Sequence, residues 1–149
     1  MWNDKKSISL SKLCVLVFTA MLIGTDLSAP WLVRWFVDFS RANLVGKEAF
    51  FLVTIYSGSV PAAVLLFCLY RLLRRIELEQ VFIATNVNYL RRISWSCFVG
   101  AIICFASMLY YFPWVFVAVA AAFMGLIVRV IKNVIAQAVE LKNESELTI

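Results

Sequence analysis

Four long apolar stretches, separated by short polar segments, form the dominant pattern of this chain. Within each stretch the apolar residues are continuous rather than alternating, which indicates helices that face lipid instead of the strands of a membrane barrel. About 20 such residues cross a hydrocarbon core roughly 30 Å thick. We therefore expect four membrane-spanning helices, at residues 8–29, 49–70, 92–111 and 114–133.

The division between the last two spans follows from length. Residues 93–128 carry no charge, and as a single helix they would measure about 54 Å at 1.5 Å per residue. This is too long for one crossing, so the chain must fold back. Pro113 lies in an aromatic segment, residues 110–114, and we place the turn there. The last span is expected to continue as an amphipathic helix and to fray at residues 143–145.

The first span is the least regular. Lys12 interrupts it, and a lysine near a helix end can extend its ammonium group to the membrane surface. Asp26 and Pro30 follow, and we expect a turn before the proline, because proline disrupts a helix interior. A cleaved signal peptide is a competing interpretation, since two lysines precede a short apolar core. Leu27 stands where the cleavage site needs a small residue, which argues against it.

The composition also places the protein in a membrane. Hydrophobic residues make up 63% of the 149 residues, and the mean hydropathy is +0.88. A soluble domain has about 45–50% apolar residues, so this chain has too few polar side chains to cover a globule. The expected fold class is an all-α integral membrane protein, a four-transmembrane-helix bundle forming a single domain over residues 1–149. The four cysteines fall within apolar runs and lack metal-ligand spacing.

The distribution of lysine and arginine sets the predicted orientation. These residues accumulate on the cytoplasmic side of membrane helices. Of the fourteen in the chain, Arg34, Arg41 and Lys47 lie opposite the termini and the central loop, residues 71–91, and the rest lie on the same side as that loop. We therefore expect both termini, the central loop and the tail, residues 134–149, in the cytoplasm. The four helices would lie in the bacterial inner membrane, with basic side chains against its anionic leaflet.

Asp26 is the one acid close to membrane depth and the first candidate for chemistry. It shares a helix face with Lys12 and Thr19, at seven-residue spacing. An intramembrane carboxylate is costly and usually functional, which would make it a cation or proton site in a wet cavity with Thr19, Ser57 and Ser59. The alternative places it at the outer interface, where it begins a turn. We favour the interface position, because no second span carries an acid.

Small residues recur four positions apart in the later spans. This spacing lets two helices approach closely, either within the chain's own bundle or in a homo-oligomer. We favour packing within the bundle. The pairs are Gly58 with Ala62, Ser96 with Gly100, Ala118 with Ala122, and Ala121 with Gly125.

The sequence offers no catalytic constellation. Histidine, the commonest general base and metal ligand, is absent. There is no glycine-rich phosphate loop, no nucleophile beside a base and no pair of acids within a span. We therefore expect no enzymatic activity, no cofactor and no metal site.

The central loop carries the most side-chain chemistry outside the apolar spans. Thr85 or Asn86 is expected to cap the helix that enters the third span, because the first amides of a helix need an acceptor. Arg91 and Arg92 follow at the inner leaflet, where each gains about 1 kcal/mol against anionic lipid. The loop is therefore either a lipid anchor or a docking surface for a cytoplasmic partner.

Two segments, residues 81–93 and 138–149, resemble the bacterial four-span membrane proteins of domain-of-unknown-function family 2975 (DUF2975). The inner loop of that family carries a phenylalanine, an asparagine and a Leu-Arg pair, and its tail runs from Glu-Leu-Lys to a final Leu-Thr. This chain departs from the pattern at Glu79 and Gln80, where the family usually has a glycine. The matching residues are Phe82, Asn86, Leu90, Arg91, Glu140, Leu141, Leu147 and Thr148.

The resemblance implies a context rather than an activity. Such proteins are commonly encoded beside a very small helix-turn-helix regulator, which implies a membrane protein that holds or modulates a transcription regulator without itself contacting nucleic acid. The leading hypothesis is a non-enzymatic interaction protein, and the alternative is a small transporter, an exporter subunit or a toxin-immunity membrane protein. The predicted partner-binding residues are Phe82, Asn86, Leu90, Arg91, Arg92, Glu140, Leu141, Leu147, Thr148 and Ile149.

Overall fold

The computed structural model describes residues 4–40 and 46–147, and within these ranges the chain forms four helices and no strand. The helices are α1 (Asp4–Phe39), α2 (Glu48–Glu77), α3 (Ala84–Ser107) and α4 (Trp114–Leu147). Each is long and apolar enough to cross a membrane. The prediction of an all-α protein with four membrane-spanning helices is confirmed.

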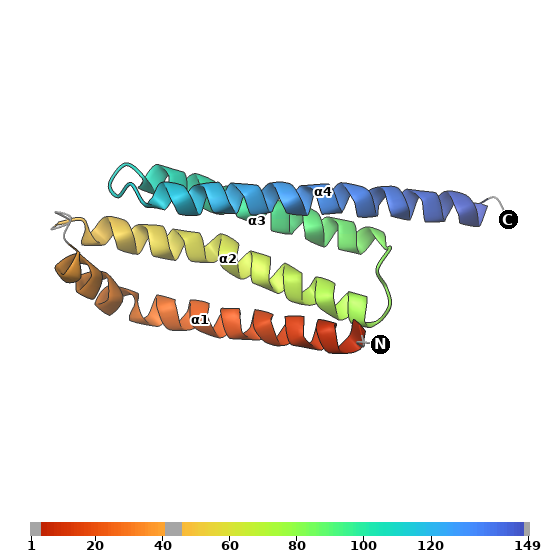
Figure 1. Ribbon diagram of the computed structural model, residues 1–149, viewed down its shortest axis with the longest axis horizontal. Coiled ribbons are helices and arrows are strands. Elements are labelled where there is room, and N and C mark those ends of the chain that lie inside the picture. The colour runs from red at the N-terminus through yellow and green to blue at the C-terminus, as the bar shows by residue number, and fades with distance from the viewer. Residues whose placement is uncertain (1–3, 41–45, 148–149) are drawn as a thin grey trace.

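The helices run antiparallel and lie in the order of the sequence (Figure 1). α1 packs along α2, α2 along α3, and α3 along α4. The start of α1, the end of α4 and the α2–α3 loop, residues 78–83, lie at one end of the molecule, here called the arginine end. The α3–α4 turn, residues 108–113, lies at the opposite end, here called the aromatic end.

α1 continues through Pro30 to Phe39, so the predicted turn before Pro30 is wrong. Proline has no backbone N–H, which leaves the carbonyl of Asp26, four residues earlier, without its helical donor. The hydroxyl of Tyr56 on α2 donates to that carbonyl over 3.2 Å. A donor from the neighbouring helix thus replaces the missing one, and α1 bends in its second half without ending (Figure 1).

The last two helices also differ in extent from the predicted spans. α3 begins at Ala84, inside the predicted central loop, and ends at Ser107. The turn that follows includes Pro113, as expected. α4 remains helical to Leu147, so the predicted fraying at residues 143–145 is wrong.

Two buried clusters hold the helices together. One lies towards the arginine end, and α4 packs against it through Val128 and Ile135. The other lies at the aromatic end, where Phe51 of α2 meets two valines of α1. The first cluster consists of Cys68, Leu72, Leu90, Ile93 and Cys97, and the second of Val33, Val37 and Phe51.

Small residues bring α3 and α4 into close contact. A Cβ added at Gly125 would lie 3.0 Å from Cε1 of Phe98 and 3.2 Å from Cβ of Cys97. The hydroxyl of Ser94 also donates to the Gly125 carbonyl over 3.0 Å. For the pair of Ala121 with Gly125, the prediction of packing within the chain is confirmed at the glycine.

The other two glycines of the predicted pairs are not tightly packed. An added Cβ at Gly58 or Gly100 would meet no atom within 4 Å. Both residues line a cavity of about 300 Å³ between α2, α3 and α4. The expectation of close helix contact at these two positions is therefore wrong.

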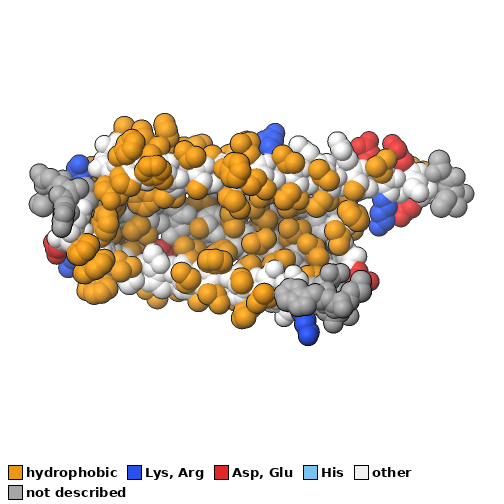
Figure 2. Space-filling model, in the orientation of Figure 1, with side chains coloured by type: hydrophobic (Ala, Val, Ile, Leu, Met, Phe, Trp, Pro, Cys, Tyr) orange, Lys and Arg blue, Asp and Glu red, His pale blue; other side chains and the backbone are white. Residues whose placement is uncertain are grey.

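The surface of the isolated chain is mainly apolar (Figure 2). Side chains such as Leu27, Phe39 and Leu109 are 81%, 74% and 88% exposed. A soluble monomer rarely shows apolar patches of this extent, whereas lipid chains cover them in a bilayer. Most of the charged side chains visible in this view lie near the two ends of the molecule, as four membrane spans require.

Candidate functional site

Asp26 lies inside the continuous helix α1, opposite the middle of the apolar run of α2. Its Oδ1 atom accepts a hydrogen bond from the hydroxyl of Ser59 on α2, over 2.6 Å. Ser59 stands near the middle of the uncharged run at residues 49–70, so Asp26 is opposite the centre of an apolar span. The continuous α1 helix carries it there, because no turn intervenes. The expectation that Asp26 begins a turn is therefore wrong.

A cavity of about 400 Å³ separates the middle parts of α1 and α2. Thr19, Asp26 and Ser59, three of the four residues named for a wet cavity, line it together. Ser57 lies outside this group, because it lines a different cavity beside Thr54. Most of the remaining wall is apolar, so the carboxylate faces a half-open cavity with few polar groups.

The cavity is bounded towards the arginine end by an ion pair between α1 and α2. The Nζ atom of Lys12 lies 2.7 Å from Oε2 of Glu77. The same Nζ atom lies 5.9 Å from the ring centroid of Tyr70, and Tyr70 lines the cavity. Lys12 thus reaches the partner helix, where its charge is balanced and its ammonium group contacts an aromatic face.

Asn86 has a different role from the predicted helix cap. α3 begins at Ala84 after Ile83, whose side chain makes no capping hydrogen bond. Asn86 is fully buried, and its Nδ2 atom donates to the carbonyls of Gln80 and Val81 over 2.6 and 2.7 Å. This amide side chain therefore braces the α2–α3 loop from inside. It is not exposed for a partner, contrary to the predicted contact.

The departure from the family pattern falls at a strained backbone position. Glu79 has φ of 62°, in the left-handed region that glycine enters without steric cost and other residues rarely adopt. The family resemblance implies a glycine near this position. The loop therefore makes a sharp turn here with Glu79 in place of the family's glycine.

The remaining predicted partner-binding residues divide into buried and exposed groups. Leu90 is 5% exposed and belongs to the buried cluster of α2 and α3, so it supports the fold. Thr148 and Ile149 lie outside the described residues. The exposed residues are Phe82, Arg91 and Arg92 near the loop, and Glu140, Leu141 and Leu147 on α4.

The end of α4 projects beyond the other helices (Figure 1). Every residue from 140 to 147 is exposed, which is roughly 12 Å of helix at 1.5 Å per residue. Figure 2 shows acidic and basic side chains gathered on this projecting end.

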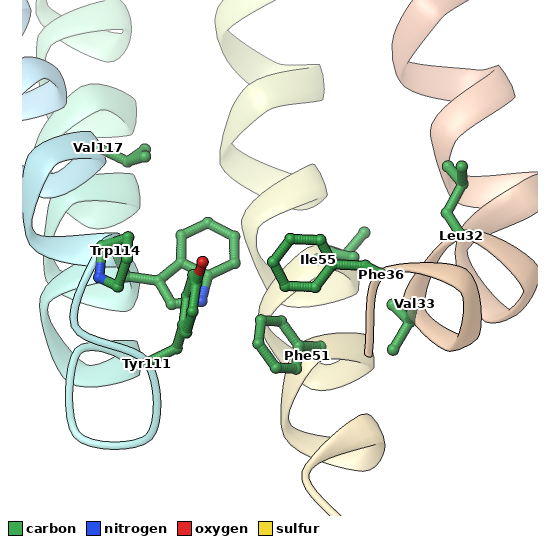
Figure 3. A pocket seen from close by; sticks show the side chains of 9 residues that line it. Leu32, Val33, Phe36, Phe51, Ile55, Tyr111, Trp114 and Val117 are labelled. Atoms are coloured by element: carbon green, nitrogen blue, oxygen red, sulfur yellow. The ribbon is translucent and has the colours of Figure 1, made fainter. Parts of the chain in front are cut away.

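A second cavity, at the aromatic end, was not anticipated. It has a volume of about 350 Å³ and lies between α1, α2 and the start of α4. The rings of Phe36, Phe51, Tyr111 and Trp114 face it (Figure 3). The Nε1 atom of Trp114 is buried and lacks a hydrogen-bond partner among the described residues. The aromatic segment was visible in the sequence, but its packing against α1 was not.

The described residues bring no three histidine, cysteine, aspartate or glutamate side chains together as a metal-binding group. The hydroxyls of Thr54, Ser107 and Tyr110 do form a connected group between α2 and the end of α3. Their uncharged polar side chains within apolar spans were the signal that could have identified them.

Comparison with known proteins gives one family. Residues 25–149 match the model of a family described as "Protein of unknown function (DUF2975)". The matched range includes Asp26, the α2–α3 loop and the projecting end of α4. No match to the chain was found among curated proteins or solved structures.

Proposed function

The chain belongs to the DUF2975 family, and on this basis we propose that it is a membrane-embedded interaction protein whose arginine end binds a regulatory protein in the cytoplasm. The proposed partner is a small helix-turn-helix transcription regulator, as the family resemblance implies. The proposed location is the bacterial inner membrane.

The observation that carries the proposal is the projecting end of α4. Leu141 and Leu147 are 65% and 85% exposed there, on a helix that has left the packed part of the molecule (Figure 1). Leu141 lies seven residues after Val134, so the two share one helix face. A helix that presents leucines beside charged residues is suited to a groove on a partner protein.

The distribution of charged residues supports both the predicted membrane orientation and the proposed class of partner. Arg71, Arg74, Arg75, Arg91 and Arg92 lie near the arginine end, and such residues favour the cytoplasmic side. The projecting end carries Glu140, Glu144 and Glu146 against a single lysine, Lys142. An acidic helix complements the basic surface that DNA-binding domains carry.

The test is capture of the regulator encoded beside the gene by the full-length protein in detergent. Replacing Leu141 and Leu147 together by alanine is expected to weaken capture by about tenfold or more, because buried apolar anchors dominate binding energy. Leu126→Ala, a change on a 55% exposed residue in the apolar span of α4, serves as the control and should leave capture unchanged.

A reporter fused after Ile149 provides an independent test of the orientation. Activity in the cytoplasm is expected. Activity in the periplasm alone, or equal capture by the double variant and the parent chain, would overturn the proposal.

A second candidate function is favoured by Asp26. Its contact with Ser59 inside an apolar span suits a small transporter, an exporter subunit or a toxin-immunity membrane protein, since intramembrane carboxylates often line a transport path. Asp26→Asn should then abolish flux or protection in cells. Unchanged flux or protection would remove this candidate.

A further inference from the structure

We propose that the cavity between α1 and α2, here called the Asp26 cavity, binds an amphipathic molecule that carries one primary ammonium group. Asp26 would hold the ammonium group, and the walls of the cavity would hold the apolar body. The proposal does not rest on the regulatory partner or on transport, because it concerns binding within this cavity alone.

Within residues 4–40 and 46–147, the carboxylate of Asp26 has no counter-ion. Among the described residues, Ser59 is its hydrogen-bond partner, and no lysine or arginine forms an ion pair with it. An isolated carboxylate is strongly disfavoured in a low-dielectric region. The basic residue on the same helix face, Lys12, already forms an ion pair with Glu77. A cationic ligand would supply the missing charge.

The hydroxyl of Ser59 can change its hydrogen-bond acceptor when a ligand binds. Its oxygen lies 2.6 Å from Oδ1 of Asp26 and 2.7 Å from the backbone oxygen of Ile55. A hydroxyl has one hydrogen, so it can satisfy only one of these acceptors fully. When an ammonium group binds Asp26, the Ser59 hydroxyl can turn to Ile55 and present its lone pair to the ligand.

The walls of the cavity select for an apolar body. Leu22, Leu66 and Phe67 line it, and the hydroxyl of Thr19 donates to the carbonyl of Val15 on its own helix, over 2.8 Å. The volume of about 400 Å³ lies within the range of pockets that bind small organic molecules. The described lining is too poor in oxygen atoms for a hard metal ion, which takes six or more such ligands.

The arrangement also orients the ligand. At the arginine end of the cavity the ring of Phe67 already faces the Arg71 guanidinium, at 5.3 Å, and the ring of Tyr70 faces Lys12. These cations disfavour a second positive charge there. The ammonium group is therefore directed to Asp26, and the apolar body points towards Phe67.

The experiment is a fluorescence titration of the full chain in phosphatidylcholine nanodiscs, a lipid without a primary ammonium group. The probe is dansylcadaverine, whose primary amine is joined by a short apolar tether to a fluorophore that brightens in apolar surroundings. Saturable binding is expected, with the apparent Kd raised at least tenfold by Asp26→Asn. Asp26→Glu keeps the charge and should retain part of the affinity.

Two controls separate charge recognition from partitioning into lipid. Asp38→Asn removes an exposed carboxylate from the same helix and should leave the titration unchanged. Dansylamide has the fluorophore without the amine, and its signal should not depend on Asp26. Equal titrations for the parent chain and Asp26→Asn, both with the parent's helical content, would overturn the proposal, as would equal binding of dansylamide.

Competition identifies the source of the ammonium group. Octylamine should displace the probe, whereas phosphatidylethanolamine in the nanodisc should not, because its headgroup remains at the surface, roughly 15 Å from the bilayer centre. Displacement by phosphatidylethanolamine alone would overturn the assignment to a free amine and favour a lipid headgroup. Either result leaves the capture of a regulator by α4 unaffected, so the two proposals fail separately.

Discussion

Single polar side chains decide several features of this protein. Asn86 orders the α2–α3 loop through two backbone carbonyls, and Tyr56 supplies the donor that Pro30 removes from α1. Each acts on a carbonyl that has no helical partner. A buried carbonyl without a donor costs about 1–3 kcal/mol, so these two side chains stabilise backbone that the local sequence disfavours.

Asn86→Ala should therefore destabilise the protein. The change leaves the carbonyls of Gln80 and Val81 without their donor, and we expect a loss of about 2–4 kcal/mol in the free energy of unfolding. Unfolding by SDS in mixed micelles, followed by helical circular dichroism, measures it. Asn88→Ala, on an exposed residue of the same helix, should change stability by less than about 0.5 kcal/mol. Equal losses for the two variants would contradict the bracing role.

At the scale of helices, the contact between α3 and α4 depends on a residue without a side chain, Gly125. Gly125 is buried against Cys97 and Phe98, at distances that leave no space for a Cβ. Gly100 lies on the same pair of helices beside a cavity and has open space. The two glycines therefore form a natural comparison between tight and loose packing.

Gly125→Val should separate α3 from α4. Overpacking a close helix contact costs about 1–3 kcal/mol, which should lower the SDS concentration at half unfolding. Gly100→Val adds the same atoms towards a cavity of about 300 Å³ and is expected to be neutral or stabilising. The hypothesis of a tight α3–α4 contact would be abandoned if Gly125→Val were as stable as Gly100→Val.

Considered as a whole, the molecule holds α1 at two separated places. At the aromatic end Val33 and Val37 pack against Phe51, and at the arginine end Lys12 pairs with Glu77. The Asp26 cavity lies between these contacts. α1 can therefore enclose a ligand without losing its attachment to α2.

Phe51→Ala tests the attachment at the aromatic end. Phe51 is 4% exposed and contacts rings from both α1 and the α3–α4 turn, so its loss enlarges the neighbouring cavity of about 350 Å³. We expect a loss of about 3–5 kcal/mol in the free energy of unfolding. Phe123→Ala, on a 62% exposed residue of α4, should have little effect. A matching loss for Phe123→Ala would argue against a special role for this cluster.

The sequence by itself determined the class, the number of helices, the α3–α4 turn and the family resemblance. These features depend on the length and order of apolar runs and on residues adjacent in the chain, because a bilayer requires roughly 20 apolar residues per crossing. The continuity of α1 through Pro30 was not predictable in this way, since its supporting donor comes from another helix.

Only the tertiary structure decided the depth of Asp26, the burial of Asn86 and the outward course of α4. The partner of Asp26 stands 33 positions away in the sequence, and no periodicity along one helix reports which residues a second helix places opposite it. The local sequence pattern determines the secondary structure of a segment, whereas packing between segments determines which polar groups come into contact. The physical reason is that hydrogen bonds and cavities between helices depend on helix register, which the chain acquires only when the helices pack together.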